Sequence, residues 1–415
     1  MEYAEKLEGV RRALAPMRYI SPEEGEYFFG YYDLPAYNAD GTRHLASRLP
    51  FSDHDREPED EVEIGEIDTE TRLFHPLART SAWCFQQNCM LQYGWENPDL
   101  VFYNTFDKKD GTYHTVRRHM KTGEEVKTTR ALATVARNGQ YGLAVNFPRI
   151  WDFRAGYGYC NTKDPYFHIN TPKDDGVYLC DFEGNEKLLF SYEELDRRFA
   201  APDKRGAKIV VNHITLNPSG TRFLILLRNF RTEDCPAWST SLITADLEGN
   251  LCPVSLDTMV SHYWWWDDKY ILAFSNPEDH TPSSQKGHLY MIEDCDSHRY
   301  WKVGSPLLSD AWDIHCSVSP DGRYLIGDSY PPARDAKYDG DTEITAAGYR
   351  HIRIQDLHTG KSGVLCEIYS PLPSNGDIRC DLHARFSRDG KRLSFDSVAR
   401  GKREIVEIDL TKLRL

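Results

Sequence analysis

Short apolar stretches follow polar turns along most of this chain, and the same pattern returns many times. Each copy has a few turn-forming residues, usually ending in glycine, and then a run of apolar and β-branched positions typical of a strand. Two copies, 97–105 and 266–275, lack the glycine but keep the turn and the strand. The complete copies are YNADGTRHLASR (37–48), VARNGQYGLAVN (135–146), LNPSGTRFLILL (216–227), SPDGRYLIGDS (319–329) and SRDGKRLSFDS (387–397).

A second hairpin signal follows most copies. It reads as a strand, an Asp, Gly or Asn turn and another strand, as in HMKTGEEV, YLCDFEGNEKLLF, LITADLEGNLCPV, LYMIEDCDSHRYW and IRIQDLHTGKSGVL. Two hairpins per unit form a four-stranded sheet, and seven such units predict an all-β, seven-bladed β-propeller. A β-sandwich is the alternative, but sandwiches rarely repeat one hairpin type this often.

The N-terminal stretch reads differently. The segment EYAEKLEGVRRALAP (2–16) is predicted to form a short helix that ends at Pro16. We therefore expect an N-terminal helical extension over residues 1–20 and the propeller over residues 21–415.

Composition limits the partners. The formal charge of −14 disfavours a nucleic-acid or anionic-membrane binder, because such partners need a basic surface. The first twenty residues lack the apolar block of a signal peptide, and no run is long enough to span a bilayer. Ten cysteines lie singly, without a C-x-x-C pair, which indicates reduced thiols. We expect a cytoplasmic protein.

Four histidines occupy one position of the repeat. His213, His315 and His383 each lie seven residues before the turn glycine, and His262 lies seven before Lys269, which replaces that glycine. The first strand of a propeller blade lines the central channel, so equivalent positions lie at one height around the axis. Four imidazoles would then converge at one end of the channel, where they could hold a metal ion or transfer protons.

Neighbouring residues could complete this site. Period-two alternation places Asp313 on the face of His315, and Asp381 on the face of His383, as metal ligands or as groups that orient the imidazoles. Cys316 is expected to point the opposite way. Cys380, in the loop before its strand, could reach the metal.

Two further stretches could bind a sugar acid. SHYWWWDDKY places Trp264 and Trp266 on the strand face of His262, as stacking platforms for sugar rings, with core packing as the alternative. The stretch 146–167 reads as a long irregular connection that carries Arg149, Arg154, Tyr157 and Tyr159. Its alternative is a packed loop rich in Tyr and Gly.

These parts suit lyase chemistry on a uronic acid. The C5 proton of a uronate lies α to a carboxylate, and a metal or an arginine that neutralises the carboxylate stabilises the enolate-like transition state. A histidine or tyrosine can take the proton while the C4 oxygen leaves.

Several motifs carry a family resemblance over residues 27 to the C-terminus. They are FFGYYDLPAYNADG, CFQQNCMLQ, RAGYGY, NHITLNPSGTRF, SHYWWWDD, HCSVSPDGRYLIGDSYP and RCDLHARFSRDGKRLSFDS. In this order they resemble the seven-bladed propellers of the oligogalacturonate lyases and the related ulvan-lyase-like propellers. The resemblance implies a divalent metal, manganese or zinc, held by His262 of SHYWWW and His383 of CDLH, with His, Tyr and Arg in catalysis.

We therefore expect a polysaccharide lyase that cleaves a uronic-acid-containing oligosaccharide by metal-assisted β-elimination. The expected metal ligands are His262, His315, His383 and Cys380. The expected catalytic groups are His213, Tyr157 or Tyr159 as base or acid, with Arg149 and Arg154 on the carboxylate, and the expected substrate contacts are Arg228, Trp264 and Trp266.

There are two alternatives to a lyase, of which the second is disfavoured. One is a non-catalytic propeller that binds a carbohydrate or a protein and holds a structural metal. A peptidase is disfavoured because the chain lacks a G-x-S-x-G motif. The acidic runs 53–68 and 338–343 fit no calcium-binding loop and are expected to be solvated.

Overall fold

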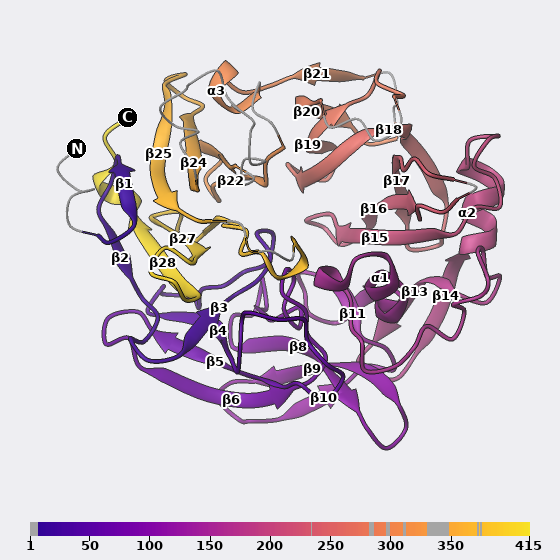
Figure 1. Cartoon of the computed structure of the whole chain (residues 1–415), viewed down its shortest axis with the longest axis horizontal. Coiled ribbons are helices and arrows are strands. Elements are labelled where there is room, and N and C mark those ends of the chain that lie inside the picture. The colour runs from indigo at the N-terminus through magenta and orange to yellow at the C-terminus, as the bar shows by residue number, and fades with distance from the viewer. Residues whose placement is uncertain are drawn as a thin grey trace.

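The strands of the chain form sheets arranged in a ring around a central axis (Figure 1). The computed structural model describes residues 7–233, 235–281, 286–295, 299–309, 313–329, 348–371, 373 and 376–415. All the strand pairs within its sheets are antiparallel. The predicted all-β propeller is confirmed.

Three four-stranded sheets come from the first half of the chain. Their strands are β3 (Glu26–Phe28), β4 (Arg43–Leu49), β5 (Val62–Asp68) and β6 (Phe74–Thr80); β7 (Gln92–Tyr93), β8 (Leu100–Asp107), β9 (Thr112–His119) and β10 (Glu125–Lys127); and β11 (Leu132–Val135), β12 (Tyr141–Ala144), β13 (Gly176–Asp181) and β14 (Glu186–Ser191).

A seven-stranded sheet follows. It contains β15 (Ile209–Leu216), β16 (Arg222–Asn229), β17 (Thr240–Asp246), β18 (Leu251–Trp265), β19 (Tyr270–Asn276), β20 (His288–Glu293) and β21 (Tyr300–Lys302). The first part of β18 pairs with β17 and its last part with β19. The sheet thus holds two four-stranded units that share β18. The number of blades, seven, stays a prediction.

The last two sheets are completed by the N-terminus. β22 (Cys316–Val318), β23 (Tyr324–Asp328), β24 (Tyr349–Asp356) and β25 (Ser362–Tyr369) take β1 (Val10–Ala13) as a fifth strand. β26 (Arg385–Phe386), β27 (Arg392–Ser397) and β28 (Glu404–Asp409) take β2 (Met17–Tyr19) as a fourth. β1 and β2 therefore lie beside the C-terminal strands β25 and β28 (Figure 1).

This closure corrects the predicted N-terminal helix. Residues 2–6 of that segment lie outside the described part of the chain, but Val10–Ala13 and Met17–Tyr19 are strands. Val10 and Ala13 are buried against β25, whereas Arg11 and Arg12 between them are exposed. The open edges of β25 and β28 offer unpaired backbone groups, and pairing with them outweighs the local helix preference. Residues 10–19 belong to the ring.

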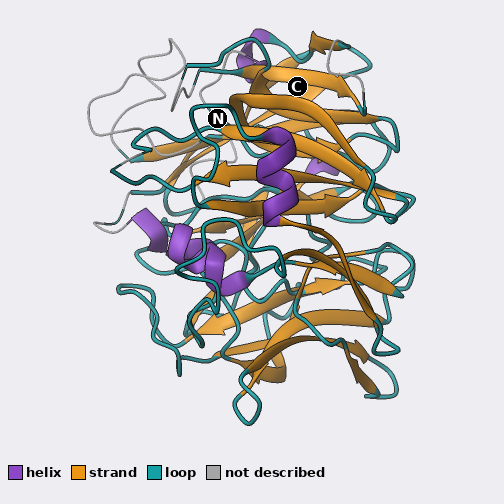
Figure 2. Cartoon of the chain, turned by 90° about the vertical axis from the view of Figure 1, so that its right-hand side faces the viewer, coloured by secondary structure: helices purple, strands orange, loops and turns teal. Residues whose placement is uncertain are grey.

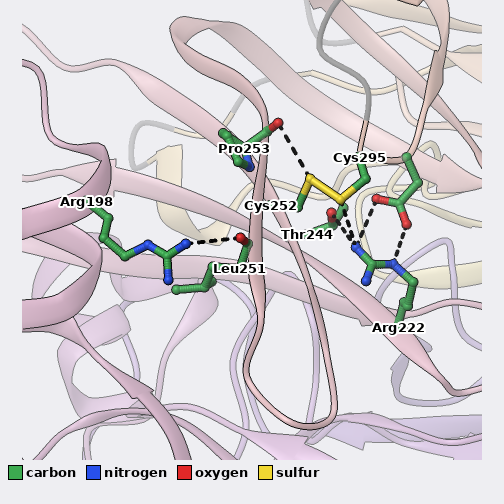
Figure 3. Close-up of a disulfide and its surroundings, with 8 residues drawn as sticks. Arg198, Arg222, Thr244, Leu251, Cys252, Pro253 and Cys295 are labelled. Carbon is green, nitrogen blue, oxygen red and sulfur yellow. Dashed lines mark hydrogen bonds and ion pairs between the residues drawn. A yellow bond between two sulfur atoms is a disulfide. The ribbon is translucent and has the colours of Figure 1, made fainter.

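A disulfide joins Cys252, at the start of β18, to Cys295, in the turn after β20 (Figure 3). It ties together the two units that share β18. This bridge corrects the prediction that the cysteines are reduced thiols, although the other eight are free. The cytoplasmic location stays a prediction.

The helices of the described residues are short and lie outside the sheets (Figure 2). They are α1 (Phe147–Phe153), α2 (Tyr192–Phe199) and α3 (Pro306–Ser309), with 3-10 turns η2 (Ala155–Tyr157), η3 (Gly376–Ile378) and η4 (Leu410–Lys412). None of the helices in the described ranges has the length and apolarity needed to cross a bilayer. The stretch predicted as irregular thus begins with α1, whose N-cap Asn146 accepts a hydrogen bond from the Arg149 amide at 3.0 Å.

Apolar side chains fill the spaces between the sheets. In β15, seven of the eight residues are buried, because this innermost strand is covered on both faces. Fully burying one such Ile or Leu side chain contributes about 1.5–3 kcal/mol. The sheets are therefore rigid supports for the side chains at the ends of their inner strands.

Candidate active site

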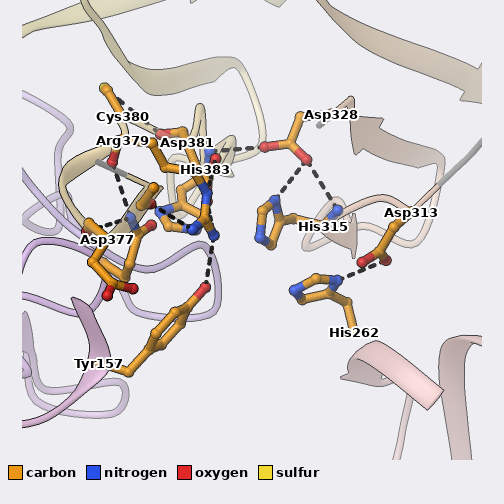
Figure 4. A network of polar contacts seen from close by, with 12 residues as sticks. Tyr157, His262, Asp313, His315, Asp328, Asp377, Arg379, Cys380, Asp381 and His383 are labelled. Carbon is orange, nitrogen blue, oxygen red and sulfur yellow. Dashed lines mark hydrogen bonds and ion pairs between the residues drawn. The ribbon is translucent and has the colours of Figure 1, made fainter. Parts of the chain in front are cut away.

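Three histidines from consecutive repeats lie side by side (Figure 4). The ring centroid of His315 is 4.2 Å from that of His262 and 4.4 Å from that of His383. His262 lies in β18, His315 immediately before β22, and His383 shortly before β26. All three are buried. The common register in the repeat therefore does bring these imidazoles together.

Asp328 connects two of these histidines. One of its carboxylate oxygens accepts hydrogen bonds from the His315 amide at 3.0 Å and from His315 Nδ1 at 2.8 Å. The other oxygen accepts the His383 amide at 2.8 Å. The contact with Nδ1 therefore holds the imidazole ring of His315 in one orientation.

His315, Asp381 and His383 form a group suited to a metal ion. One ligand atom from each lies within 4.8 Å of the others. Within the described parts of the chain, Nε2 of His383 is buried and has no hydrogen-bond partner, an arrangement that is costly unless a ligand completes it. Two imidazoles and a carboxylate suit divalent ions such as Mn²⁺ or Zn²⁺, so the residues present fit the predicted metal.

Two arginines surround Asp381. Arg379 lies 2.7 Å from one carboxylate oxygen, and Arg350 donates to the other at 3.0 Å. Burial alone would raise the pKa of Asp381, but the charges of Arg379 and Arg350 hold it well below its usual range. Asp381 is therefore ionised and can serve as a ligand.

His262 and Cys380, both predicted metal ligands, lie beside this group rather than in it. His262 Nδ1 is 2.9 Å from Asp313, which also accepts a hydrogen bond from Ser261. The Cys380 thiol is buried, and burial raises its pKa to about 11, so it is not a thiolate at neutral pH. Asp381, which alternation places on the His383 face, takes the position expected for Cys380.

His213 lies on another side of the cluster, against tyrosines. Its ring stacks on Tyr31 with centroids 5.3 Å apart, and its Nε2 is 3.4 Å from the Tyr31 hydroxyl. Gln87 is 3.3 Å from its Nδ1. Burial, reinforced by the nearby charge of Arg228, lowers the pKa of His213 well below its usual value. His213 is neutral at pH 7 and able to accept a proton.

Tyr157 lies close to His213, with ring centroids 5.5 Å apart. Its hydroxyl accepts a hydrogen bond from Arg379 at 3.1 Å, which links it to Asp381 (Figure 4). The Arg154 guanidinium lies 4.4 Å from the centroid of the Tyr157 ring. Tyr157 and Arg154 are thus at the site, as the sequence predicts.

Tyr159 and Arg149 are not at the site. Tyr159 is buried against Phe147 and accepts a hydrogen bond from Asn104 at 2.9 Å. Arg149 is fully buried, paired with Asp164 at 3.1 Å, and donates to carbonyl oxygens of residues 169, 170 and 209. These two side chains hold the 146–170 segment in place, so the structure gives them a structural role instead of the predicted catalytic one.

Arg228 is buried near the site and donates to Asn212 at 2.6 Å. Burial, reinforced by the charge of Arg154, lowers its pKa to about 10. The positive charges of Arg154 and Arg228 thus repel each other, and a bound anion would reduce this repulsion.

Tyr31 and Tyr32 were not predicted as site residues, although FFGYYDLP was among the family motifs. The Tyr32 ring lies 5.2 Å from His315, and Tyr31 lies 4.9 Å from His383. Asp396 fixes their segment by accepting the amides of Phe29 and Gly30. Gly30 has φ +124°, and a Cβ there would lie 3.0 Å from Asn88, so glycine is required.

Trp264 and Trp266 do not face the histidines. Both line a separate cavity at the other end of the inner strands, beside the turns that follow them. The predicted association of these rings with the metal site is therefore not found.

Comparison with known proteins supports the fold. No protein family model matches the chain, and no curated protein sequence matches it. A crystal structure of an oligogalacturonate lyase from Vibrio parahaemolyticus superposes with a TM-score of 0.64 at 13% identity, over 96% of this chain and 95% of that one. An oligogalacturonate lyase in complex with manganese gives 0.63 at 13% identity, over 97% and 94%.

A more distant likeness is to the tricorn protease, with a TM-score of 0.51 at 11% identity over 94% of this chain but only 34% of that one. The two lyase structures match almost from end to end, whereas the protease matches through one part of a larger protein. Over nearly its whole length, this chain has the β-propeller fold of the oligogalacturonate lyases.

Proposed function

We propose that this protein is a lyase that cleaves a uronic-acid-containing oligosaccharide by β-elimination. The observation that carries the proposal is the group of His315, Asp381 and His383, next to a neutral His213 and the cations Arg154 and Arg228. Among the described residues, the buried Nε2 of His383 has no hydrogen-bond partner. Metal ligands, a base and carboxylate-binding cations are the parts that this reaction needs.

His315, Asp381 and His383 would hold the divalent ion, manganese or zinc. When bound, such an ion withdraws negative charge from the uronate carboxylate and so acidifies the C5 proton. Asp328 fixes the backbone of both histidines, and Arg379 and Arg350 keep Asp381 ionised, so the ligand set is preorganised.

The remaining groups bind the substrate carboxylate and transfer protons. Arg154 and Arg228 pair with the substrate carboxylate, which is the anion their mutual repulsion favours. His213 takes the C5 proton, the electron pair of the C5–H bond forms the C4=C5 double bond, and the C4–O bond breaks. Tyr157 donates its proton to the departing oxygen. After product release His213 gives its proton to solvent and Tyr157 takes one from solvent, so both groups return to their starting states.

A non-catalytic propeller with a structural metal is the second candidate. The near-complete burial of His213 and Tyr157 favours it, because groups that act on a polymer must be reached by it. It predicts that chelation lowers the melting temperature of the protein and that the protein cleaves no substrate, with or without metal.

The test uses purified protein with pectic, ulvan-like and glycosaminoglycan oligomers in the presence of Mn²⁺ or Zn²⁺. The expected result is ultraviolet absorbance from the new C4=C5 double bond. His213→Gln should lower kcat by about 10²–10⁴-fold, the usual contribution of a general base. His75→Gln, on the exposed outer strand β6, is the matched control. If no uronate oligomer gives the absorbance, the lyase proposal is wrong.

A further inference from the structure

A cavity of about 400 Å³ opens at the end of the channel away from the histidines. Its walls come from the turns that follow the inner strands, including Pro218, Pro320 and Ser387, and from Trp95, Trp264 and Trp266. Its volume is in the range of small-ligand sites. No step of the proposed lyase reaction uses it.

The cavity is separated from the metal group by one layer of side chains. The four residue steps from His262 to Trp266 span about 13 Å of extended chain at about 3.3 Å per residue. Tyr32 lies between, since it lines the cavity and its ring is also 5.2 Å from that of His315. A ligand in the cavity would thus not touch the metal ligands.

Tryptophan rings dominate the walls. Trp266, the residue after the end of β18, is 36% exposed at the rim, whereas Trp264 lies within β18 and is partly buried. Trp265 also contributes, but its Nε1 donates to the Thr215 carbonyl and the ring is buried in the core. Exposed indole faces bind the apolar C–H faces of sugar rings, and a rigid strand holds them in fixed positions.

Arg137 supplies hydrogen-bond donors to the cavity. Its guanidinium lies 4.9 Å from the centroid of the Trp95 ring, and within the described parts of the chain it donates to no acceptor. Arg388 is different, because it donates to the carbonyls of residues 37, 94 and 95. Arg385, the third arginine of the lining, donates to Ser394, to Asp396 and to two backbone carbonyls. Among the described residues, Arg137 is therefore the arginine of the cavity best placed to bind a ligand.

Carboxylates supply the acceptors. Asp33 lines the cavity and accepts a hydrogen bond from Thr215 at 3.1 Å. Asp267 and Asp268 lie at the rim, each with one oxygen bound to turn amides. Three carboxylates balance the three guanidinium groups of the lining, so the cavity has no excess of positive charge for an anionic ligand. Carboxylates, a guanidinium and indole rings together suit a hydroxyl-rich neutral ring.

We propose that this cavity is a second, non-catalytic binding site for a neutral saccharide, distinct from the metal group. The sugar stacks on Trp264 and Trp266, its hydroxyls donate to Asp33 and the rim carboxylates, and Arg137 donates to a ring or hydroxyl oxygen. The site does not depend on the proposed lyase activity.

The test is calorimetric titration of the full chain with α-1,4-galactotriose, maltotriose and cellotriose, followed by tryptophan fluorescence. At least one should bind with a Kd below about 10 mM, and α-1,4-trigalacturonate, which differs from galactotriose in its C6 carboxylates, should not compete for this site. Trp266→Ala and Arg137→Gln should each weaken binding at least tenfold. Trp301→Ala removes a ring that is 45% exposed on β21 and should change nothing.

Two outcomes would overturn the proposal. The first is that none of the three neutral trisaccharides binds, since the cavity then has no saccharide function. The second is that binding survives Trp266→Ala but is lost on chelation or in His383→Ala, since the sugar then occupies the metal site. Binding that survives chelation while no uronate is cleaved would leave the second site intact and count only against the lyase proposal.

Discussion

His315 and Asp328 are joined twice, through the backbone amide and through Nδ1 of the imidazole, at 3.0 and 2.8 Å to one carboxylate oxygen. The other oxygen holds the amide of His383, in the next repeat. A single carboxylate on a second strand thus fixes two candidate ligands from neighbouring blades. Asp396 occupies the same place in its repeat, six residues after the turn glycine, and holds the amides of the Tyr31 segment.

Asp328→Asn tests this arrangement. An asparagine keeps one acceptor oxygen, but its amide nitrogen cannot accept the His383 N–H. We expect about a 10–100-fold loss of metal affinity, the usual effect of removing a group that orients ligands. Titration calorimetry with Mn²⁺ and Zn²⁺ measures it, and Asp389→Asn, in an exposed turn, is the control. Unchanged affinity would show that the ligands do not depend on Asp328.

Asp381→Asn removes a candidate ligand and the partner of two buried arginines. Because Arg350 and Arg379 then lack their counter-charge, unfolding free energy should fall by about 3–5 kcal/mol and metal binding should be lost. Adding Arg350→Met should recover part of the stability but none of the metal affinity. Denaturant unfolding and elemental analysis separate the two effects. Full metal content in Asp381→Asn would contradict its role as a ligand.

Arg149→Met distinguishes a structural arginine from a catalytic one. The substitution leaves Asp164 buried without its partner, so we expect stability to fall by about 3–5 kcal/mol. Below the melting temperature, the KM for any uronate substrate should stay within twofold of wild type. Arg154→Met is the comparison, and it should raise KM with little effect on stability. A raised KM in Arg149→Met at unchanged stability would restore its predicted catalytic role.

Asp33 makes stability depend on pH in a defined direction. Burial raises the pKa of its carboxyl to about 6, above the ordinary 3.8, so the folded protein binds this proton more tightly than the unfolded chain. Its ionisation therefore destabilises the fold as pH rises from about 4 to 6, and the penalty is complete above that range. Asp33→Asn should be more stable than wild type by about 1–2 kcal/mol at pH 7.5 and equal to it near pH 3.5. Urea unfolding at both pH values checks this, and a difference that is the same at both would refute it.

The Cys252–Cys295 bridge closes a loop with a sequence separation of 43 residues. Chain-entropy arguments give such a loop a stabilisation of about 2–4 kcal/mol. Cys295→Ser should lower the melting temperature accordingly, and reductant should lower that of wild type by the same amount. The variant itself should not respond to reductant. A wild type that is equally insensitive would show that the bridge does not form in solution.

The sequence repeats predicted the positions of several residues of the candidate site. The offset of seven residues between His262, His315 or His383 and the following turn is a local property, and it predicted that these imidazoles lie together. The same repeat also encodes Asp328 and Asp396 at one offset, a signal that could have been found by aligning the second strands. Alternation along the strand similarly indicated Asp381 beside His383.

Other residues reached the site from distant parts of the chain. Tyr31 and Arg379 have no common register with the histidines, and Tyr157 and Tyr159 look alike in sequence although only one faces His213. The direction of each tyrosine depends on how the segment after α1 packs. Arg149 likewise looks available in the sequence, but Asp164 and several carbonyl oxygens bind it in the folded chain.

The sequence by itself determined the repeated sheets and the meeting of the histidines, because turn chemistry, strand alternation and repeat spacing act over a few residues. Only the tertiary structure decided that the N-terminus closes the ring as strands, with Met17 paired to Ile408, and that Trp264 and Trp266 face a separate cavity. These outcomes depend on backbone edges and side chains that come together from opposite ends of the chain, and no local pattern specifies such contacts.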